Sequence, residues 1–489
     1  MNHLHFCWLE AAVVLPLVGS LIVSQLRDPV RARQVSAAVS GLAFLCAVGA
    51  WQDLFTLQVH QAGDRWDLVE EVAGRGVLIV DEFSAPLLPL VALLYFLTIL
   101  ATLSTKLKRF SFAWTLASES IALATFSTIE PRLMILLLVL GVFPPFFELR
   151  SRGRPTRVYV LHMALFSALL MLGWSIVERE GATAHEHSSL ALLPLLTALL
   201  IRNGMAPFHC WMTDLFEHAS FGTALLFVTP LVGAYATVRL VLPVAPDEIL
   251  RSMGLIAIFT SVYCAGMALI QREARRFFCY LFLSHSAQVF VGLEAATTLG
   301  LTGGLCVWLS VSIALGGFGL TLRALEARRG RLSLVDFQGL YDHAPALAIC
   351  FLLTGLASVG FPGTFGFVGA ELLVDGAVAA YPIVGGAVVV AAALNGIAFI
   401  QAYFKLFTGT RYVSSVSLQI GGRERIAVLS LAGLILGGGI LPQPGVASRH
   451  HAAIHILEHR YNRSLNAQPE PTGDQVLLEP VEHQHVPHE

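Results

Sequence analysis

Apolar segments of about the length of a membrane-spanning helix follow one another along almost the whole chain, with short polar connections between them. A helix that crosses a bilayer needs roughly 20 mostly apolar residues, so each segment predicts one crossing. We predict fourteen crossings, at residues 8–26, 35–55, 77–104, 110–128, 133–149, 158–177, 189–218, 220–243, 250–271, 277–297, 301–325, 345–380, 383–407 and 424–442. The pattern therefore predicts an all-α, polytopic membrane protein with little chain left for a soluble domain.

Composition agrees with this pattern and excludes several classes of function. Of the 489 residues, 55% are hydrophobic and 13% are charged, whereas a soluble domain carries about 25% charged residues. The seven cysteines stand far apart without CxxC or Cys/His ligand spacing, so we predict no disulfide framework and no metal or iron–sulfur site. No basic patch indicates nucleic acid binding. The first segment lacks a basic region before it and a cleavage site after it, which favours a retained helix over a signal peptide.

Positive charge is concentrated in alternate loops, which predicts how the chain is oriented. One set of loops carries the Lys and Arg residues within 27–33, 106–109, 150–157, 272–276, 328–331 and 411–425, while the other holds only Arg65, Arg75, Arg132 and Arg179. Short basic loops remain in the cytoplasm, so both termini are predicted on the outer side of the cell inner membrane. Residues 443–489 are polar and predict a disordered tail; its scattered histidines can bind metal, but a solvated tail is the favoured interpretation.

Two of the predicted spans contain helix breakers at corresponding places, Asn203–Pro207 in span seven and Gly360–Thr364 in span twelve. Paired discontinuous helices indicate an inverted-repeat transporter with ion sites near the bilayer midplane. The alternative is that Gly and Pro are simply common in membrane helices, but two matching breaks favour the repeat. The predicted divisions are helices one to three at 1–109, five-helix repeats at 110–243 and 250–407, helix fourteen at 408–442 and the tail at 443–489.

Ionisable residues inside the spans are the candidate functional groups, because each one costs free energy unless it is paired or hydrated. A histidine can exchange protons near neutral pH, whereas the guanidinium of Arg202 keeps its proton and can only set the local potential or order water. Asp81, Glu82, Glu130 and Glu148 are predicted to reach water from span ends. The candidates for a proton pathway are Arg202, His285, Glu371, Glu119, His209 and Lys405. A purely structural role stays open for each of them.

Three motifs resemble those of the antiporter-like subunits of respiratory complex I, with chain M of NADH:quinone oxidoreductase as the nearest type. They lie at residues 201–214, around the first break, at 275–285, at the start of span ten, and at 361–371, in span twelve. Subunits of that family have fourteen helices, of which the seventh and twelfth are broken. The resemblance implies a proton-translocating membrane-arm subunit without a redox cofactor, surrounded by other membrane-arm subunits, with quinone reduction elsewhere in the complex.

The chain also departs from the family pattern at positions that carry charge there. Arg202 stands in place of a lysine, Val139 and Leu231 in place of a glutamate and a second lysine, and the acid of span twelve is shifted by one position to Glu371. Glu119 aligns with a family glutamate. Two alternatives therefore stay open: a non-pumping scaffold subunit, or the ion-conducting subunit of a Mrp-type cation/proton antiporter, a hydrogenase or an inorganic-carbon uptake complex. The sequence also leaves open whether the ion is H⁺ or Na⁺.

Overall fold

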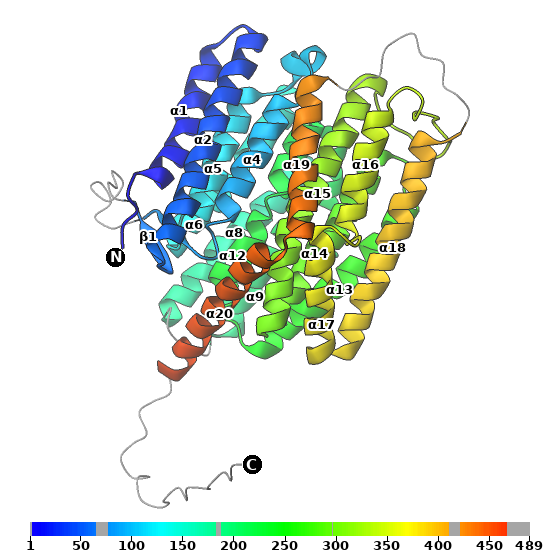
Figure 1. Cartoon of the computed structure of the whole chain (residues 1–489). Coiled ribbons are helices and arrows are strands. Elements are labelled where there is room, and N and C mark those ends of the chain that lie inside the picture. Colours follow the sequence, from blue (N-terminus) through cyan, green and yellow to red (C-terminus); the bar gives the residue numbers. More distant parts are fainter. Residues whose placement is uncertain (1, 65–76, 182–186, 296, 410–420, 467–489) are drawn as a thin grey trace, which may run out of the picture.

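In the computed structural model, most helices run side by side in one bundle, while the last helix, α20, lies across its lower end (Figure 1). The structure describes residues 2–64, 77–181, 187–295, 297–409 and 421–466. In chain order the elements are α1 (Trp8–Gln25), α2 (Pro29–Leu57), β1 (Gln61–Gly63), β2 (Ile79–Asp81), α4 (Leu87–Leu100), η1 (Ser104–Arg109), α5 (Phe112–Phe126), α6 (Pro131–Leu140), α7 (Phe143–Ser151), α8 (Arg157–Glu180), α9 (Ser189–Arg202), α10 (Cys210–His218), α11 (Phe221–Val228), α12 (Val232–Ala236), η2 (Thr237–Val241), α13 (Asp247–Leu269), α14 (Ala274–Glu294), α15 (Thr298–Arg329), α16 (Pro345–Ser358), α17 (Phe365–Ala380), α18 (Pro382–Phe407), α19 (Gly422–Ile440) and α20 (Gln443–Asn466). The two short strands pair antiparallel, with Ala62 opposite Val80.

The multi-pass architecture predicted from the apolar segments is confirmed. Within the described ranges, nine helical segments are long and apolar enough to cross a membrane, or ten if the bent pair α19–α20 is one span. Three more apolar helices, α4, α9 and α16, are shorter than a full crossing. The exact count of fourteen and the division into two inverted repeats stay predictions.

Helix α15 forms the centre of the bundle. It is 32 residues long and packs against α14, α16, α17 and α19 along its length. Its side chains are apolar on all sides, as expected for a helix that is surrounded by others, and Trp308 and Phe318 on it are fully buried. Glycines bring α15 and α17 close together, since a Cβ at Gly303 would lie 2.5 Å from the backbone nitrogen of Leu373. Small residues at helix crossings are typical of membrane bundles.

The two predicted helix breaks are confirmed, between α9 and α10 and between α16 and α17. Gly204 has φ +65°, and Gly360 and Gly363 have φ +82° and +87°, a left-handed conformation that glycine adopts at little cost. Side chains satisfy backbone groups released at the first break: the indole nitrogen of Trp211 donates to the Ile201 carbonyl at 2.7 Å. The Ala206 amide, in turn, donates to the Thr260 hydroxyl at 3.0 Å.

The span predicted as one continuous helix at 220–243 is also broken. It divides into α11, α12 and the π-helical turn η2, and Leu231 between α11 and α12 has φ +54°. Two side chains of α15 satisfy carbonyls at this break: Ser312 Oγ donates to Thr229 O at 2.9 Å, and Trp308 Nε1 donates to Pro230 O at 3.3 Å. Hydroxyl and indole donors on a neighbouring helix are what allow a membrane helix to be interrupted.

The prediction of a disordered tail from residue 443 onwards is wrong for its first part, which is the helix α20. Arg449 on this helix is fully buried and donates to the carbonyl oxygens of Phe83 and Glu82, at 3.0 and 2.7 Å. Ala452 and Ala453 are buried beside it. The polar composition of this segment did not indicate a docking face, because the sequence does not distinguish an arginine that binds buried carbonyl groups from an arginine that is solvated. Residues 467–489 lie outside the described part of the chain.

Candidate functional site

Arg202 lies at the carboxyl end of α9, directly before the first helix break, and its side chain is buried. Its guanidinium carbon is 4.2 Å from the centroid of the Phe227 ring and 6.0 Å from that of Trp211. Nη2 also donates to the Phe227 carbonyl at 3.4 Å. Among the described residues no carboxylate forms a salt bridge with it. The positive charge is therefore stabilised by aromatic faces and one carbonyl rather than by an acid.

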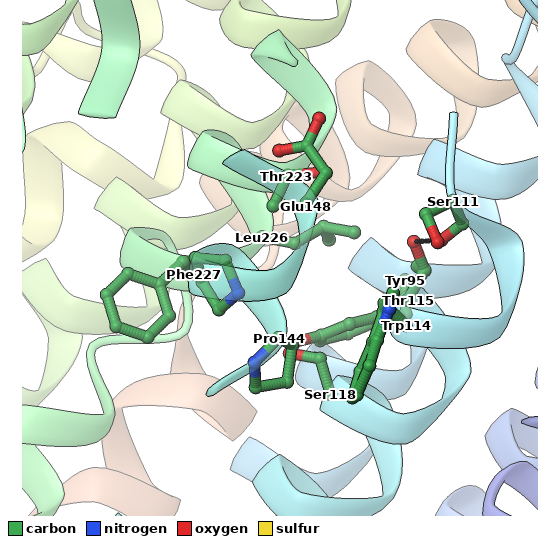
Figure 2. Close-up of a pocket in the computed structure, with 11 residues that line it drawn as sticks. Tyr95, Ser111, Trp114, Thr115, Ser118, Pro144, Glu148, Thr223, Leu226 and Phe227 are labelled. Atoms are coloured by element: carbon green, nitrogen blue, oxygen red, sulfur yellow. Dashed lines mark hydrogen bonds between the residues drawn. The ribbon is translucent and has the colours of Figure 1, made fainter. Parts of the chain in front are cut away.

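Two small adjoining cavities lead away from Arg202. The one that Arg202 itself lines has a volume of about 20 Å³ and is shared with Thr125 and Val232. The other, of about 10 Å³, reaches Glu148 and Thr223 (Figure 2). Both are lined by Tyr95, Ser118, Leu226 and Phe227. A single water needs about 10–15 Å³, so this narrow seam, lined mostly by apolar side chains with a few polar ones, has room for one or two waters.

Glu148 stands at the far end of this seam, and its side chain is almost fully buried. One carboxylate oxygen lies 2.8 Å from Nη1 of Arg152, one helical turn further on. The same oxygen accepts the Ser220 amide at 3.1 Å. The prediction that Glu148 reaches water at a span end is wrong, because the amino end of α11 covers it. Its spacing from Arg152, which places the two on one helix face, is the sequence signal that could have indicated a paired acid.

Tyr95 and Ser118 connect the two cavities. The Tyr95 hydroxyl lies 2.7 Å from Ser118 Oγ, and both groups can donate and accept a proton. Figure 2 shows them on the side of the smaller cavity opposite Phe227, next to Trp114. A carboxylate, two hydroxyls and a fixed positive charge therefore all line this pair of cavities, with the hydroxyls common to both.

His285 directly follows Ser284, which belongs to a second polar group further along the bundle. It is buried on α14, and its Nε2 has no hydrogen-bond partner within the described ranges. The preceding residue, Ser284, donates to the Ser261 carbonyl at 2.8 Å and accepts from Asn395 Nδ2 at 2.8 Å. Since Thr260, next to Ser261, binds the broken segment of span seven, polar contacts run from the first break through α13 and α14 to α18.

His209 lies beside this second group. It is half-buried directly after the first break, with its ring centroid 5.5 Å from that of Tyr263 and 6.0 Å from that of Tyr280. Its Nδ1 is buried without a partner among the residues described. The structure thus brings His209 and the α14 groups to the same part of the bundle.

Glu119 is buried on α5 but faces away from the seam. One of its oxygens accepts a hydrogen bond from Ser40 of α2 at 2.6 Å. Its other oxygen is buried and has no partner in the part of the chain that the structure describes. Glu119 therefore links α5 to the N-terminal helices.

The last two candidates do not lie in the interior. Glu371 is exposed on α17, as is Asp375 one turn further along. Lys405, near the end of α18, donates to the Val335 carbonyl at 2.9 Å and lies 4.4 Å from the Phe337 ring centroid. A lysine at the end of a membrane helix commonly extends to the interface in this way.

Sequence comparison relates the chain to a group of respiratory membrane proteins. Residues 155–395 match the family described as NADH:quinone oxidoreductase/Mrp antiporter, TM. Subunit M of the NADH-quinone oxidoreductase of Mycobacterium tuberculosis is 27% identical over 369 residues, covering 68% of this chain and 66% of the relative. Subunit 13 of the Thermus thermophilus enzyme is 25% identical over 494 residues, covering 93% of this chain and 98% of the relative.

Solved structures share the fold. A chain of the Mrp complex from Dietzia sp. superposes with a TM-score of 0.81 at 17% identity, covering 94% of this chain and 99% of the other. A chain of respiratory complex I from Thermus thermophilus superposes with a TM-score of 0.77 at 23% identity, covering 92% and 99%. The resemblance noted in the three motifs is thus confirmed, and residues 155–395 form a domain of the NADH:quinone oxidoreductase/Mrp antiporter transmembrane family.

Proposed function

We propose that this chain is a membrane-arm subunit of a respiratory complex of the NADH:quinone oxidoreductase type, and that it carries protons along the seam between Glu148 and Arg202. The observation that carries the proposal is the pair of cavities, one lined by Glu148 and the other by Arg202, that share Tyr95 and Ser118 in their walls. The similarity of the chain to subunit M and subunit 13 supports the kind of complex. Quinone reduction would take place in other subunits.

Charge along the seam suggests how it works. Glu148, paired with Arg152, is the carboxyl group of the seam to which a proton can be delivered. Arg202 keeps its proton, so it acts as a fixed positive charge that repels an incoming proton and orders water in front of it. A change in the field at Arg202, produced by a conformational step in a neighbouring subunit, would then drive the proton on towards the Ser284 and His285 group.

The proposed orientation places the Glu148 end of the seam on the cytoplasmic side. Arg275 contacts Glu326 and the carbonyl of Phe216, and Arg331 donates to the carbonyl of Glu217, so several basic loops gather at the Glu148 end. Short basic loops stay in the cytoplasm. Protons would enter beside Glu148, and the amino end of α1 and helix α20 would lie on the outer side.

The test is proton uptake by the intact complex reconstituted in liposomes, with the wild-type chain or with Glu148→Gln. We expect the variant to lower the proton yield per electron pair, because removing a proton-transfer group typically slows that transfer by about 100-fold or more. Glu178→Gln is the matched control, since Glu178 pairs with Arg132 at 2.8 Å on the surface. An unchanged yield with Glu148→Gln in an assembled complex would exclude this route.

A non-pumping scaffold is the second candidate, and the absence of a salt-bridge acid at Arg202 among the described residues favours it. It predicts that the complex assembles normally and that its proton yield responds to neither Glu148→Gln nor Arg202→Met. The identity of the copurifying subunits would distinguish these alternatives. A respiratory complex is expected to bring both flavin and quinone-reducing subunits, whereas an antiporter or a hydrogenase is not.

A further inference from the structure

We infer that the chain holds a divalent zinc ion at a site formed by His60, Glu82 and His455. The site lies at the lower end of the bundle, away from the Glu148 seam, and it does not depend on the proposed function. His60 precedes β1, Glu82 follows β2 and His455 is on α20, so the ion would join the last helix to the first part of the chain.

The geometry of the three side chains fits a metal ion. Their ligand atoms lie within 4.8 Å of one another. His60 Nδ1 is 3.2 Å from Glu82 Oε1, and His455 Nε2 is 3.7 Å from Glu82 Oε2. Two ligands bound tetrahedrally at about 2.0–2.1 Å from zinc are separated by about 3.4 Å. Small side-chain rotations are therefore enough to place one ion among all three.

One oxygen of Glu82 is left without a hydrogen bond, which is unusual for a buried carboxylate atom. Glu82 Oε2 is buried, and within the described ranges it has no hydrogen-bond partner; the 3.7 Å to His455 is too long for one. A buried acceptor that lacks a donor costs about 1–3 kcal/mol. A cation between this oxygen and the two imidazoles would satisfy it.

Three arginines lie near the site, and two of them are paired with acids of their own; the third, Arg449, donates to the backbone carbonyl of Glu82. The site opens into a cavity of about 590 Å³ whose lining includes Arg239 and Arg460. Arg239 is paired with Asp81 at 2.7 Å, and Arg460 is paired with Asp247. The two positive charges are thus neutralised by their own partners, while Glu82 contributes its negative charge to the ligand set.

The donor set favours zinc among the common divalent ions. Two imidazoles and one carboxylate are ligands of first-row transition metals, whereas Mg²⁺ and Ca²⁺ prefer oxygen alone. Three protein ligands leave a fourth position for water or for His459, which lines the same cavity one turn after His455. Since Arg449 already fixes α20 to Glu82 and Phe83, the metal would hold the next two turns of the helix in place over the cavity.

The test is zinc binding to the full chain, purified in detergent with an affinity tag free of histidine and stripped with a chelator. Calorimetric titration is expected to give one zinc per chain. Glu82→Gln and His455→Ala are each expected to weaken binding at least about tenfold, since changes at metal sites of this kind cost 10–100-fold or more. His451→Ala is the matched control, because this histidine is exposed on the same helix and lies outside the ligand set.

Two further measurements separate the site from other histidines and from unfolding. A full chain with His483, His485 and His488 changed to alanine is expected to bind zinc as the wild type does. Zinc is expected to slow hydrogen exchange of the amides of α20, and this protection is expected to be lost in Glu82→Gln. Absence of stoichiometric binding, binding that survives His455→Ala, or binding that disappears with the three tail histidines would each overturn the inference.

Discussion

At the scale of single residues, buried polar side chains fall into two kinds. Some, such as Ser312 and Trp308, complete the backbone hydrogen bonding of an interrupted helix and leave nothing free for transport. Others, such as Glu148 and Arg202, are ionisable groups that line a cavity. Only the second kind can act on a proton, and residue type alone does not distinguish them, because both kinds are polar residues within apolar segments.

Glu119 offers a test of the structural kind. Ser40→Ala removes the hydroxyl that donates to Glu119 Oε1, and the carboxylate would then be buried with both oxygens unpartnered by described side chains. We expect this variant to lose about 1–3 kcal/mol of stability, measured by thermal unfolding in detergent. Ser24→Ala is the control, because Ser24 is an exposed helix serine bonded to the Leu21 carbonyl. Equal stability of the two variants would show that Glu119 does not depend on Ser40.

At the scale of elements, glycine decides how closely helices approach. A Cβ at Gly376 on α17 would lie 2.5 Å from Gly300 Cα on α15, so these two backbones are in direct contact. Backbone atoms cannot move aside as a flexible side chain can. The position of α17 against the central helix therefore rests on residues without side chains.

Gly303→Ala tests this crossing. Its Cβ would meet the backbone nitrogen of Leu373 at 2.5 Å and the carbonyl carbon of Leu372 at 2.7 Å. We expect a loss of about 1–3 kcal/mol from the forced separation of α15 and α17, again measured by thermal unfolding. Gly266→Ala on α13 is the matched control: its Cβ meets nothing within 4 Å, and the better helix propensity of alanine is expected to give a gain of about 0.5–1 kcal/mol. A neutral Gly303→Ala would contradict the close packing.

At the scale of the whole molecule, exposed carboxylates on a membrane helix point to a neighbouring subunit. Glu371 and Asp375 lie one turn apart on the exposed side of α17, and the adjacent α18 exposes Ile383, Val389 and Ile397. Charged groups within a span are costly in lipid and usually face protein or water. Exposed apolar residues on the adjacent helix agree with an interface inside a membrane arm.

Glu371→Lys is therefore expected to reduce the amount of neighbouring subunits that copurify with the chain, because it reverses the charge offered to the partner. Quantitative mass spectrometry of the mildly solubilised complex measures this. Asp336→Lys is the control, since Asp336 is exposed in the loop before α16, outside the described helices. Full recovery of partners with Glu371→Lys would indicate that this face of α17 does not carry a subunit contact.

The sequence by itself determined that the chain crosses a membrane many times and that spans seven and twelve are interrupted, because each follows from local hydropathy or from Gly and Pro at fixed positions. It also identified the family through motifs that surround those breaks. Only the tertiary structure decided that Glu148 is buried, that Glu371 is exposed, that residues 443–466 form a docked helix, and that His60, Glu82 and His455 meet. Those outcomes depend on which side chains from distant segments cover one another, and hydropathy along one segment carries no information about its neighbours in space.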